Sequence, residues 1–242
     1  MFLTLCLTVP VVAYLCGGAN GAIIFSKLVY HKDIREYGSK NPGFTNFKRV
    51  FGPKLAWFVF LFDILKTVVP VLSAAFLFRY FGTDVTEDAS LLWKFGAAYA
   101  GIFCMIGHAY PVWYKFKGGK TFSCGAAIVW FIDWRVALVV AGIFLLSLLL
   151  VTKIMSLSSC LAALCFPIGT LTVGLITSSM GTTLYLIMVI INFLGAALLI
   201  FRHKENLGRL FRGEEKKFYL FGHKTSEEKA PENGEAQPTE EK

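Results

Sequence analysis

Long apolar runs alternate with short polar segments along this chain. A helix needs about 20 apolar residues to cross a membrane, and six runs reach that length, while a seventh, at 121–132, is shorter. The pattern therefore predicts an all-α integral membrane protein. The six long candidates are residues 2–28, 54–80, 90–107, 134–152, 156–178 and 180–201.

Charge indicates whether the short run 121–132 also crosses, because cytoplasmic loops are enriched in Lys and Arg. If it crosses, one side holds residues 27–54 with seven Lys or Arg, 107–120 with three, Lys153, and the chain from 202 onward with nine. With only six spans, the basic first loop and the basic C-terminal segment lie on opposite sides. We therefore predict seven transmembrane helices, with the N-terminus outside and the C-terminus cytoplasmic.

Composition agrees with this class. A mean hydropathy of +0.59 and 15% aromatic residues are typical of repeated membrane spans. The net charge of +8 is distributed by topology and faces anionic lipid head groups, so we expect membrane lipid and no nucleic acid as a partner. The six Cys are scattered singly without a Cys-x-x-Cys pair, which supports neither a metal site nor a redox dithiol. We expect no cofactor.

The two ends of the chain differ in character. The first run has no basic residue before Lys27 and is longer than the apolar core of a signal peptide, so we predict an uncleaved span. Residues 223–242 are rich in Glu, Lys and Pro and nearly lack apolar side chains. They are predicted to form a disordered cytoplasmic tail after a membrane domain of residues 1–222.

Three polar segments fall on the predicted cytoplasmic face, each at the start or end of a span. They read "GSKNPGFTNFKR" (38–49), "GHAYPVWYKFKGGK" (107–120) and "RHKENLGRLFRGEE" (202–215). Ordinary juxtamembrane loops are also basic, and that interpretation fits any one of them alone. Three such segments on one face favour a shared binding site.

The first two segments have features of anion sites. Gly38, Pro42 and Gly43 disfavour a regular helix, which leaves backbone N–H groups for a ligand. Arg49 adds a planar guanidinium suited to phosphate. In the second segment, Lys-Gly-Gly-Lys at 117–120 combines two cations with a backbone that can approach an anion. The spacing is not that of a Walker A loop, so a nucleotide triphosphate is not implied.

One pair of charges lies inside a predicted span. Asp63 and Lys66 are three residues apart and share a helical face. Charges at membrane depth are unfavourable and usually face a bundle interior or a site. A structural ion pair and a catalytic role both satisfy this requirement.

In order, and over nearly the whole chain, the three segments resemble the three motifs of the acyl-phosphate:glycerol-3-phosphate acyltransferases, the PlsY family. "LFDILKTVVPV" also resembles the segment that follows the first motif. The resemblance implies seven helices, an active site at the cytoplasmic face and a place in the bacterial cell (inner) membrane. It implies acyl transfer from acyl phosphate to the sn-1 hydroxyl of glycerol 3-phosphate, which gives lysophosphatidic acid for phospholipid synthesis.

The resemblance also implies roles for particular residues. The acyl-phosphate head is expected among the first two segments, and glycerol 3-phosphate near His203, Glu205 and Asn206. His203 acts either as a general base or as a hydrogen-bond donor, and His108 has either a direct or a structural role. The expected catalytic residues are Ser39, Arg49, Lys120, His203 and Asn206, and the expected substrate-binding residues are Thr45, Asn46, Lys117, Gly118, Gly119, Glu205 and His108.

The chain also departs from the family pattern. Thr121-Phe122-Ser123-Cys124 stands where Gly-Val-Ala-Thr is usual, "GGANGA" replaces a common Gly-Ser-Ile-Pro pattern, and Lys40 and Pro42 replace small or aliphatic residues. The alternative is therefore a catalytically silent paralogue that binds lipids or partners.

Two other function classes are disfavoured. A transporter usually shows internal repeats and more polar groups at mid-membrane, and this chain shows neither. None of the four His begins a His-x4-Asp unit. Its absence favours an acyl-phosphate donor over acyl-CoA or acyl-ACP.

Overall fold

The computed structural model describes residues 1–177 and 182–219, and every regular element in those ranges is helical. Six helical stretches there are long and apolar enough to span a membrane, in agreement with the six long runs of the sequence. The helices are α1 (Phe2–Gly18), α2 (Gly21–Tyr30), α3 (Phe44–Phe51), α4 (Pro53–Phe81), α5 (Ala89–Ala109), α6 (Phe122–Ile132), α7 (Trp134–Leu146), α8 (Met155–Ile176), α9 (Thr183–Arg202) and α10 (Lys204–Phe211). Short turns of other helix types cover Ile34–Glu36, Val112–Tyr114 and, as a π-helix that continues α7, Ser147–Thr152.

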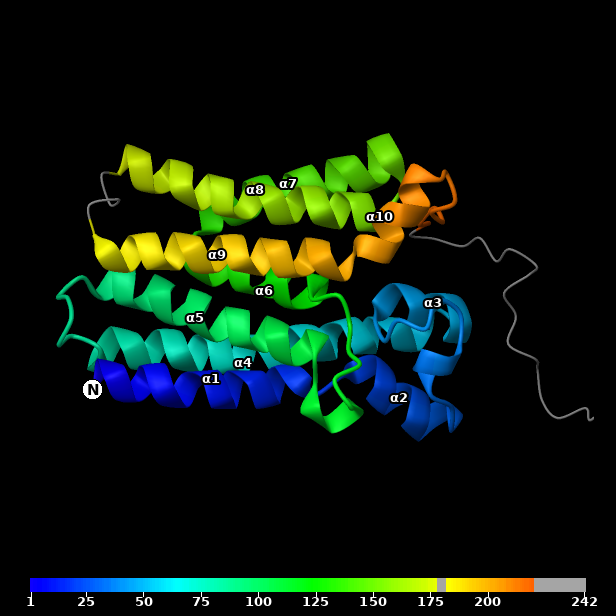
Figure 1. The fold of residues 1–242 in the computed structure, drawn as a ribbon, viewed down its shortest axis with the longest axis horizontal. Coiled ribbons are helices and arrows are strands. Elements are labelled where there is room, and N and C mark those ends of the chain that lie inside the picture. Colours follow the sequence, from blue (N-terminus) through cyan, green and yellow to red (C-terminus); the bar gives the residue numbers. More distant parts are fainter. Residues whose placement is uncertain (178–181, 220–242) are drawn as a thin grey trace, which may run out of the picture.

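The long helices run side by side as one bundle (Figure 1). The N-terminus and the α4–α5 connection lie at one end, where the Met1 ammonium approaches the Asp84 carboxylate at 3.1 Å. The short helices α2, α3 and α10 lie at the opposite end. The polar segments of the sequence therefore gather at one end of the bundle.

Helix α5 forms the centre and packs against α1, α4, α6 and α9. Close approach depends on glycines: a Cβ at Gly107 would lie 2.1 Å from the Tyr14 carbonyl oxygen of α1, and one at Gly96 would lie 2.7 Å from the Ala74 carbonyl oxygen of α4. Small residues at helix contacts are typical of membrane bundles, where packing rather than the hydrophobic effect drives association.

The predicted span 2–28 corresponds to the helical stretch Phe2–Tyr30, which is interrupted between α1 and α2. It breaks at Ala19, whose backbone is extended, and Asn20 then starts α2 by accepting a hydrogen bond from the Ile23 N–H at 3.0 Å. The Asn20 amide also donates to the Pro42 carbonyl at 3.1 Å. The break therefore ties the first helix pair to the first polar segment.

The seventh run forms the separate helix α6, which has 11 residues and is shorter than the six long stretches. At about 1.5 Å per residue it extends roughly 16 Å. The predicted span 180–201 starts within residues that the structure does not describe, and α9 covers the rest of it. The predicted tail 223–242 and its boundary with the membrane domain lie outside the described residues.

Candidate active site

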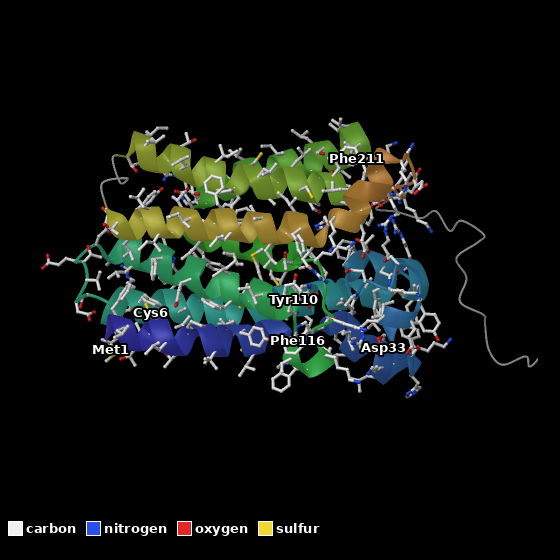
Figure 2. The ribbon with its side chains drawn as sticks, in the orientation of Figure 1. Met1, Cys6, Asp33, Tyr110, Phe116 and Phe211 are labelled. Atoms are coloured by element: carbon white, nitrogen blue, oxygen red, sulfur yellow. The ribbon has the colours of Figure 1, made fainter. Side chains whose placement is uncertain are left out.

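A polar cavity of about 310 Å³ lies at the end of the bundle that carries α2, α3 and α10. Figure 2 shows Phe211 and Asp33 toward this end and Met1 at the other. The cavity brings together the three polar segments and the start of α8. Part of each of the segments 38–49, 120–123, 155–159 and 203–216 lines it, together with Phe60, Asp63 and His108.

Asn46 folds the first polar segment into a compact loop. Its side chain is buried, accepts the Ser39 N–H at 2.8 Å and donates to the Tyr37 carbonyl at 3.0 Å. Gly38, at a φ of 57°, lies directly against this side chain. The predicted irregular run instead becomes helical at Phe44, because the turn before it is held by Asn46. Asn46 thus supports the position of Ser39 from behind.

Gly118 and Gly119 make the second segment pack tightly against its neighbours. Their N–H groups donate to the carbonyls of Ala109 and His108, at 3.2 and 2.9 Å. Their carbonyls in turn accept hydrogen bonds from the Arg202 guanidinium at 2.9 and 3.0 Å. The two N–H groups are therefore bonded within the protein, and the backbone of this pair packs against His108 and Ala109 rather than approaching an anion.

Lys120 belongs to a hydrogen-bonded network on the cavity wall. Its ammonium donates to the Asn206 side chain, and the Asn206 amide donates to Glu215 at 2.5 Å. Glu215 also accepts from Ser156 at 2.8 Å and Arg209 at 2.9 Å. Burial, with a smaller contribution from Arg209, lowers the pKa of Lys120 to about 8. Burial favours a neutral Glu215, but these hydrogen bonds outweigh it and hold the pKa of Glu215 below its usual value.

His203 lies at the joint between α9 and α10 and is buried in the cavity wall. Its Nδ1 is 2.9 Å from the Leu199 carbonyl oxygen. A carbonyl only accepts, so Nδ1 carries the hydrogen and Nε2 is left as an acceptor. Burial lowers the pKa of His203 to about 4, so the ring is neutral at pH 7.

His108 has the opposite arrangement on the cavity floor. The Lys66 ammonium donates to His108 Nδ1 at 2.9 Å and pairs with Asp63 at 2.8 Å. The hydrogen of the neutral ring is therefore on Nε2, which faces Gly119. Lys66 also donates to the Ala19 carbonyl at 2.5 Å. The Asp63–Lys66 ion pair thus links α4 to Ala19, at the break between α1 and α2, and to His108 in the second polar segment.

A family model described as glycerol-3-phosphate acyltransferase matches residues 7–213 of the chain. The chain belongs to this family. A glycerol-3-phosphate acyltransferase of Staphylococcus carnosus (strain TM300) is 37% identical over 205 residues, which cover 85% of this chain and 94% of that protein. One of Staphylococcus aureus (strain Newman) is 34% identical over 206 residues, with the same coverage.

Two solved structures are also similar to this chain. A crystal structure of PlsY (YgiH), an integral membrane glycerol 3-phosphate acyltransferase, in its glycerol 3-phosphate form has a TM-score of 0.71 and 30% identity, and covers 88% of this chain and 96% of that chain. Its lysophosphatidic acid form has a TM-score of 0.66 and 29% identity, with 88% and 95% coverage. The resemblance to the PlsY family is thereby confirmed, and the chain is an integral membrane protein of that family.

In this PlsY-family chain, most of the predicted site residues line the cavity. They are Ser39, Thr45, Asn46, Arg49, His108, Lys120, His203 and Asn206. The structure does not bring the other four predicted residues to it. Lys117 and Glu205 are exposed outside the cavity, and Gly118 and Gly119 are buried behind it.

Sequence reasoning missed several cavity residues. Arg209 and Glu215 lie inside the third polar segment, so their position there was an available signal. Ser156 and Ser159 carried no such signal, because they stand in a predicted membrane span outside the three polar segments. Thr121 was noted only as a departure from the family pattern, although it lines the cavity.

An apolar cavity of about 260 Å³ adjoins the polar one inside the bundle. Phe60, Phe122 and Ser159 line both. The rest of its wall comes from α5, α6, α7, α8 and α9. A polar cavity with basic side chains therefore adjoins an apolar one, an arrangement that fits a ligand with a charged head and a hydrocarbon chain.

Proposed function

We propose that this protein transfers an acyl chain from an acyl phosphate to the sn-1 hydroxyl of glycerol 3-phosphate, which yields lysophosphatidic acid and phosphate. One observation carries the proposal: the cationic cavity shares Phe60, Phe122 and Ser159 with the apolar one. The phosphate of an acyl phosphate fits the first and its chain the second. The two PlsY crystal forms, with glycerol 3-phosphate and with lysophosphatidic acid, support the same substrate and product here.

The proposed chemistry relies on binding and orientation. An acyl phosphate is a mixed anhydride with a good leaving group, so no protein nucleophile is required. Lys120 and Arg49 line the cavity and hold phosphoryl oxygens by charge-assisted hydrogen bonds. Ser39 and Asn206 contribute hydrogen bonds, and Thr45 lies beside them at the start of α3.

His203 takes the role of base in this proposal. Its Nε2 is an acceptor because Nδ1 donates to Leu199. The hydroxyl oxygen of glycerol 3-phosphate attacks the acyl carbon, the bond from that carbon to the phosphate oxygen breaks, and phosphate leaves with the electron pair. The hydroxyl proton passes to His203 Nε2 and then to the departing phosphate. The alternative role, donation by His203, requires an imidazolium, which its lowered pKa disfavours.

The proposed topology has seven membrane passes, with α6 as the short one. Successive long helices connect at alternating ends of the bundle, and only a pass by α6 keeps α7 in that alternation. The N-terminus is then outside, and the cavity and C-terminus are cytoplasmic in a bacterial cell (inner) membrane. A Cys at Glu87 should react with an impermeant label only from outside, and a Cys at Lys217 only from inside. Equal labelling from one side contradicts this topology.

Donor choice tests the proposed reaction. Purified protein should acylate glycerol 3-phosphate from palmitoyl phosphate and not from palmitoyl-CoA, because the chain has no His-x4-Asp unit. Each donor is supplied with labelled glycerol 3-phosphate, and labelled lysophosphatidic acid is measured. Comparable turnover from palmitoyl-CoA contradicts the donor assignment, and no turnover from palmitoyl phosphate supports the silent paralogue instead.

A further inference from the structure

Thr121 has an unusual backbone conformation at the edge of the cavity. It follows Lys120 and directly precedes α6, with φ 64° and ψ 0°. This left-handed region is rarely occupied by a β-branched residue. The side chain is fully buried, and the residue lines the polar cavity. A strained residue at such a position needs a physical reason.

The Thr121 hydroxyl is also unusual. Within residues 1–177 and 182–219, its Oγ1 is the one buried side-chain nitrogen or oxygen without a hydrogen-bond partner. A Thr at a helix N-cap usually accepts an N–H of the first turn. The left-handed backbone turns Thr121 away from that contact, and no such bond forms. A buried hydroxyl without a partner is unfavourable, so a bound ligand that pairs with it gains affinity.

The surroundings of Thr121 favour an anion. Helix α6 has 11 residues. Its first i to i+4 backbone hydrogen bond runs from the Gly125 N–H to the Thr121 carbonyl at 2.9 Å. The N–H groups before Gly125 have no partner within the helix, and the positive end of the helix dipole lies there. Phe122 and Ser123 of this first turn line the cavity, as does Lys120. A phosphoryl group matches this combination.

We propose that Thr121 is a substrate-binding residue, whose Oγ1–H donates a hydrogen bond to a phosphoryl oxygen held at the start of α6. This rests on the proposed function, since acyl phosphate and glycerol 3-phosphate both carry such a group. In the free protein the left-handed backbone leaves this buried hydroxyl without a protein partner at the first turn of α6. The family-typical glycine would relieve the backbone but supply no donor.

Four variants separate the hydroxyl from the backbone strain. Thr121→Val removes the hydroxyl and keeps the branched shape, Thr121→Ser keeps the hydroxyl, and Thr121→Gly removes the hydroxyl and the strain together. Thr172→Val is the matched control, because its hydroxyl only bonds the Ile168 carbonyl within α8, on the exposed side of that helix. Thermal stability in detergent is recorded for all four.

The expected result is a loss of activity that follows the hydroxyl. A hydrogen bond to a charged group contributes about 1.5–3 kcal/mol, so Thr121→Val and Thr121→Gly should lower kcat/KM about tenfold to a hundredfold. Thr121→Ser should stay within about threefold, and Thr172→Val within about twofold. Thr121→Gly should be at least as stable as the parent, which excludes misfolding as the cause. A rise in KM for palmitoyl phosphate alone, or for glycerol 3-phosphate alone, identifies which phosphate is bound.

A ligand-binding measurement separates this proposal from the proposed reaction. If the parent protein shows no turnover, the reaction is refuted, and the shift in melting temperature with glycerol 3-phosphate or palmitoyl phosphate becomes the readout. A shift in the parent that Thr121→Gly reduces supports the Thr121 contact. An equal shift in both proteins, no shift in the parent, or unchanged kcat/KM in Thr121→Gly overturns it.

Discussion

Two buried histidines contribute to the same cavity, and their surroundings differ. His108 on the floor accepts a hydrogen bond from Lys66 on Nδ1, and its Nε2 faces the glycine at 119. His203 on the wall donates from Nδ1 to a carbonyl and keeps Nε2 as an acceptor. The hydrogen of the neutral ring is therefore on opposite nitrogens. His108 therefore has an N–H at Nε2, whereas His203 has an acceptor at Nε2.

The charged groups near the two histidines also differ in how fully they are paired. On the floor, Asp63 and Lys66 pair with each other and are 1% and 4% exposed, so the protein satisfies its own charges there. On the wall, Lys120 and Arg209 share the single carboxylate Glu215 through a hydrogen-bonded network. An excess of positive charge is left for a ligand. We infer that the floor supports the fold and the wall binds phosphate.

Lys66→Met gives the largest expected effect and acts on stability. It leaves the Asp63 carboxylate buried without its counter-charge, which costs about 3–5 kcal/mol for a pair of this kind. The melting temperature in detergent should fall more than for any single wall variant. The control is the double variant Asp63→Leu with Lys66→Met, which should lose less than the sum of the two single changes. Additive losses contradict a coupled floor pair.

Arg49→Ala should act on turnover rather than on stability. Arg49 lines the cavity, and a charge-assisted hydrogen bond to phosphate contributes about 1.5–3 kcal/mol. We expect kcat/KM to fall about tenfold to a hundredfold, with partial recovery in Arg49→Lys, which keeps the charge but loses the planar fork. Lys54→Ala is the control, because Lys54 is basic and exposed at the start of α4 but does not line the cavity. Equal activity of the two Ala variants would contradict a phosphate-binding Arg49.

The pH dependence of kcat/KM probes the wall through Lys120. With a pKa of about 8, the ammonium is largely charged at pH 7 and loses its proton as the pH rises through 8. If the charged form binds phosphate, kcat/KM should fall above pH 8 by up to about tenfold per pH unit. Lys120→Arg should remove this fall because a guanidinium stays charged. A parent profile that is flat between pH 7 and 9.5 contradicts the assignment.

Lys117→Ala should have the smallest effect. Lys117 belongs to the same Lys-Gly-Gly-Lys run as Lys120 but is exposed outside the cavity. We expect kcat/KM within about twofold of the parent, measured at constant ionic strength so that surface charge is screened equally. A tenfold loss would show that the loop moves Lys117 into contact with substrate.

Hydropathy located the long helices because a membrane span requires a continuous apolar run. It missed the break at Ala19, where Asn20 is set in an apolar context and gains its role only through bonds to Ile23 and Pro42. The helical turn at Phe44 depends likewise on the Asn46 side chain, whose partners are seven to nine residues away.

The site was only partly predictable because it too depends on contacts between residues that are distant in the sequence. The Gly-Gly pair at 118–119 has the same sequence whether its N–H groups face a ligand or a carbonyl, and the bonds to Ala109 and His108 decide between the two. Lys120 was predicted from the two cations of its Lys-Gly-Gly-Lys run, and Asn206 from the resemblance of the third segment to the family motif. Ser156 contributes through a contact with Glu215, 59 residues away, that no local pattern encodes.

In the function that we propose, the residues of the cavity wall hold acyl phosphate and glycerol 3-phosphate during acyl transfer. The most direct measurement is kcat/KM for palmitoyl phosphate and glycerol 3-phosphate in the purified parent and in Lys120→Ala, at pH 7 and with melting temperatures recorded. We predict turnover to lysophosphatidic acid in the parent and a loss of at least about tenfold in the variant at unchanged stability. Turnover that is absent from the parent, or equal in both proteins, would contradict a catalytic role for this cavity.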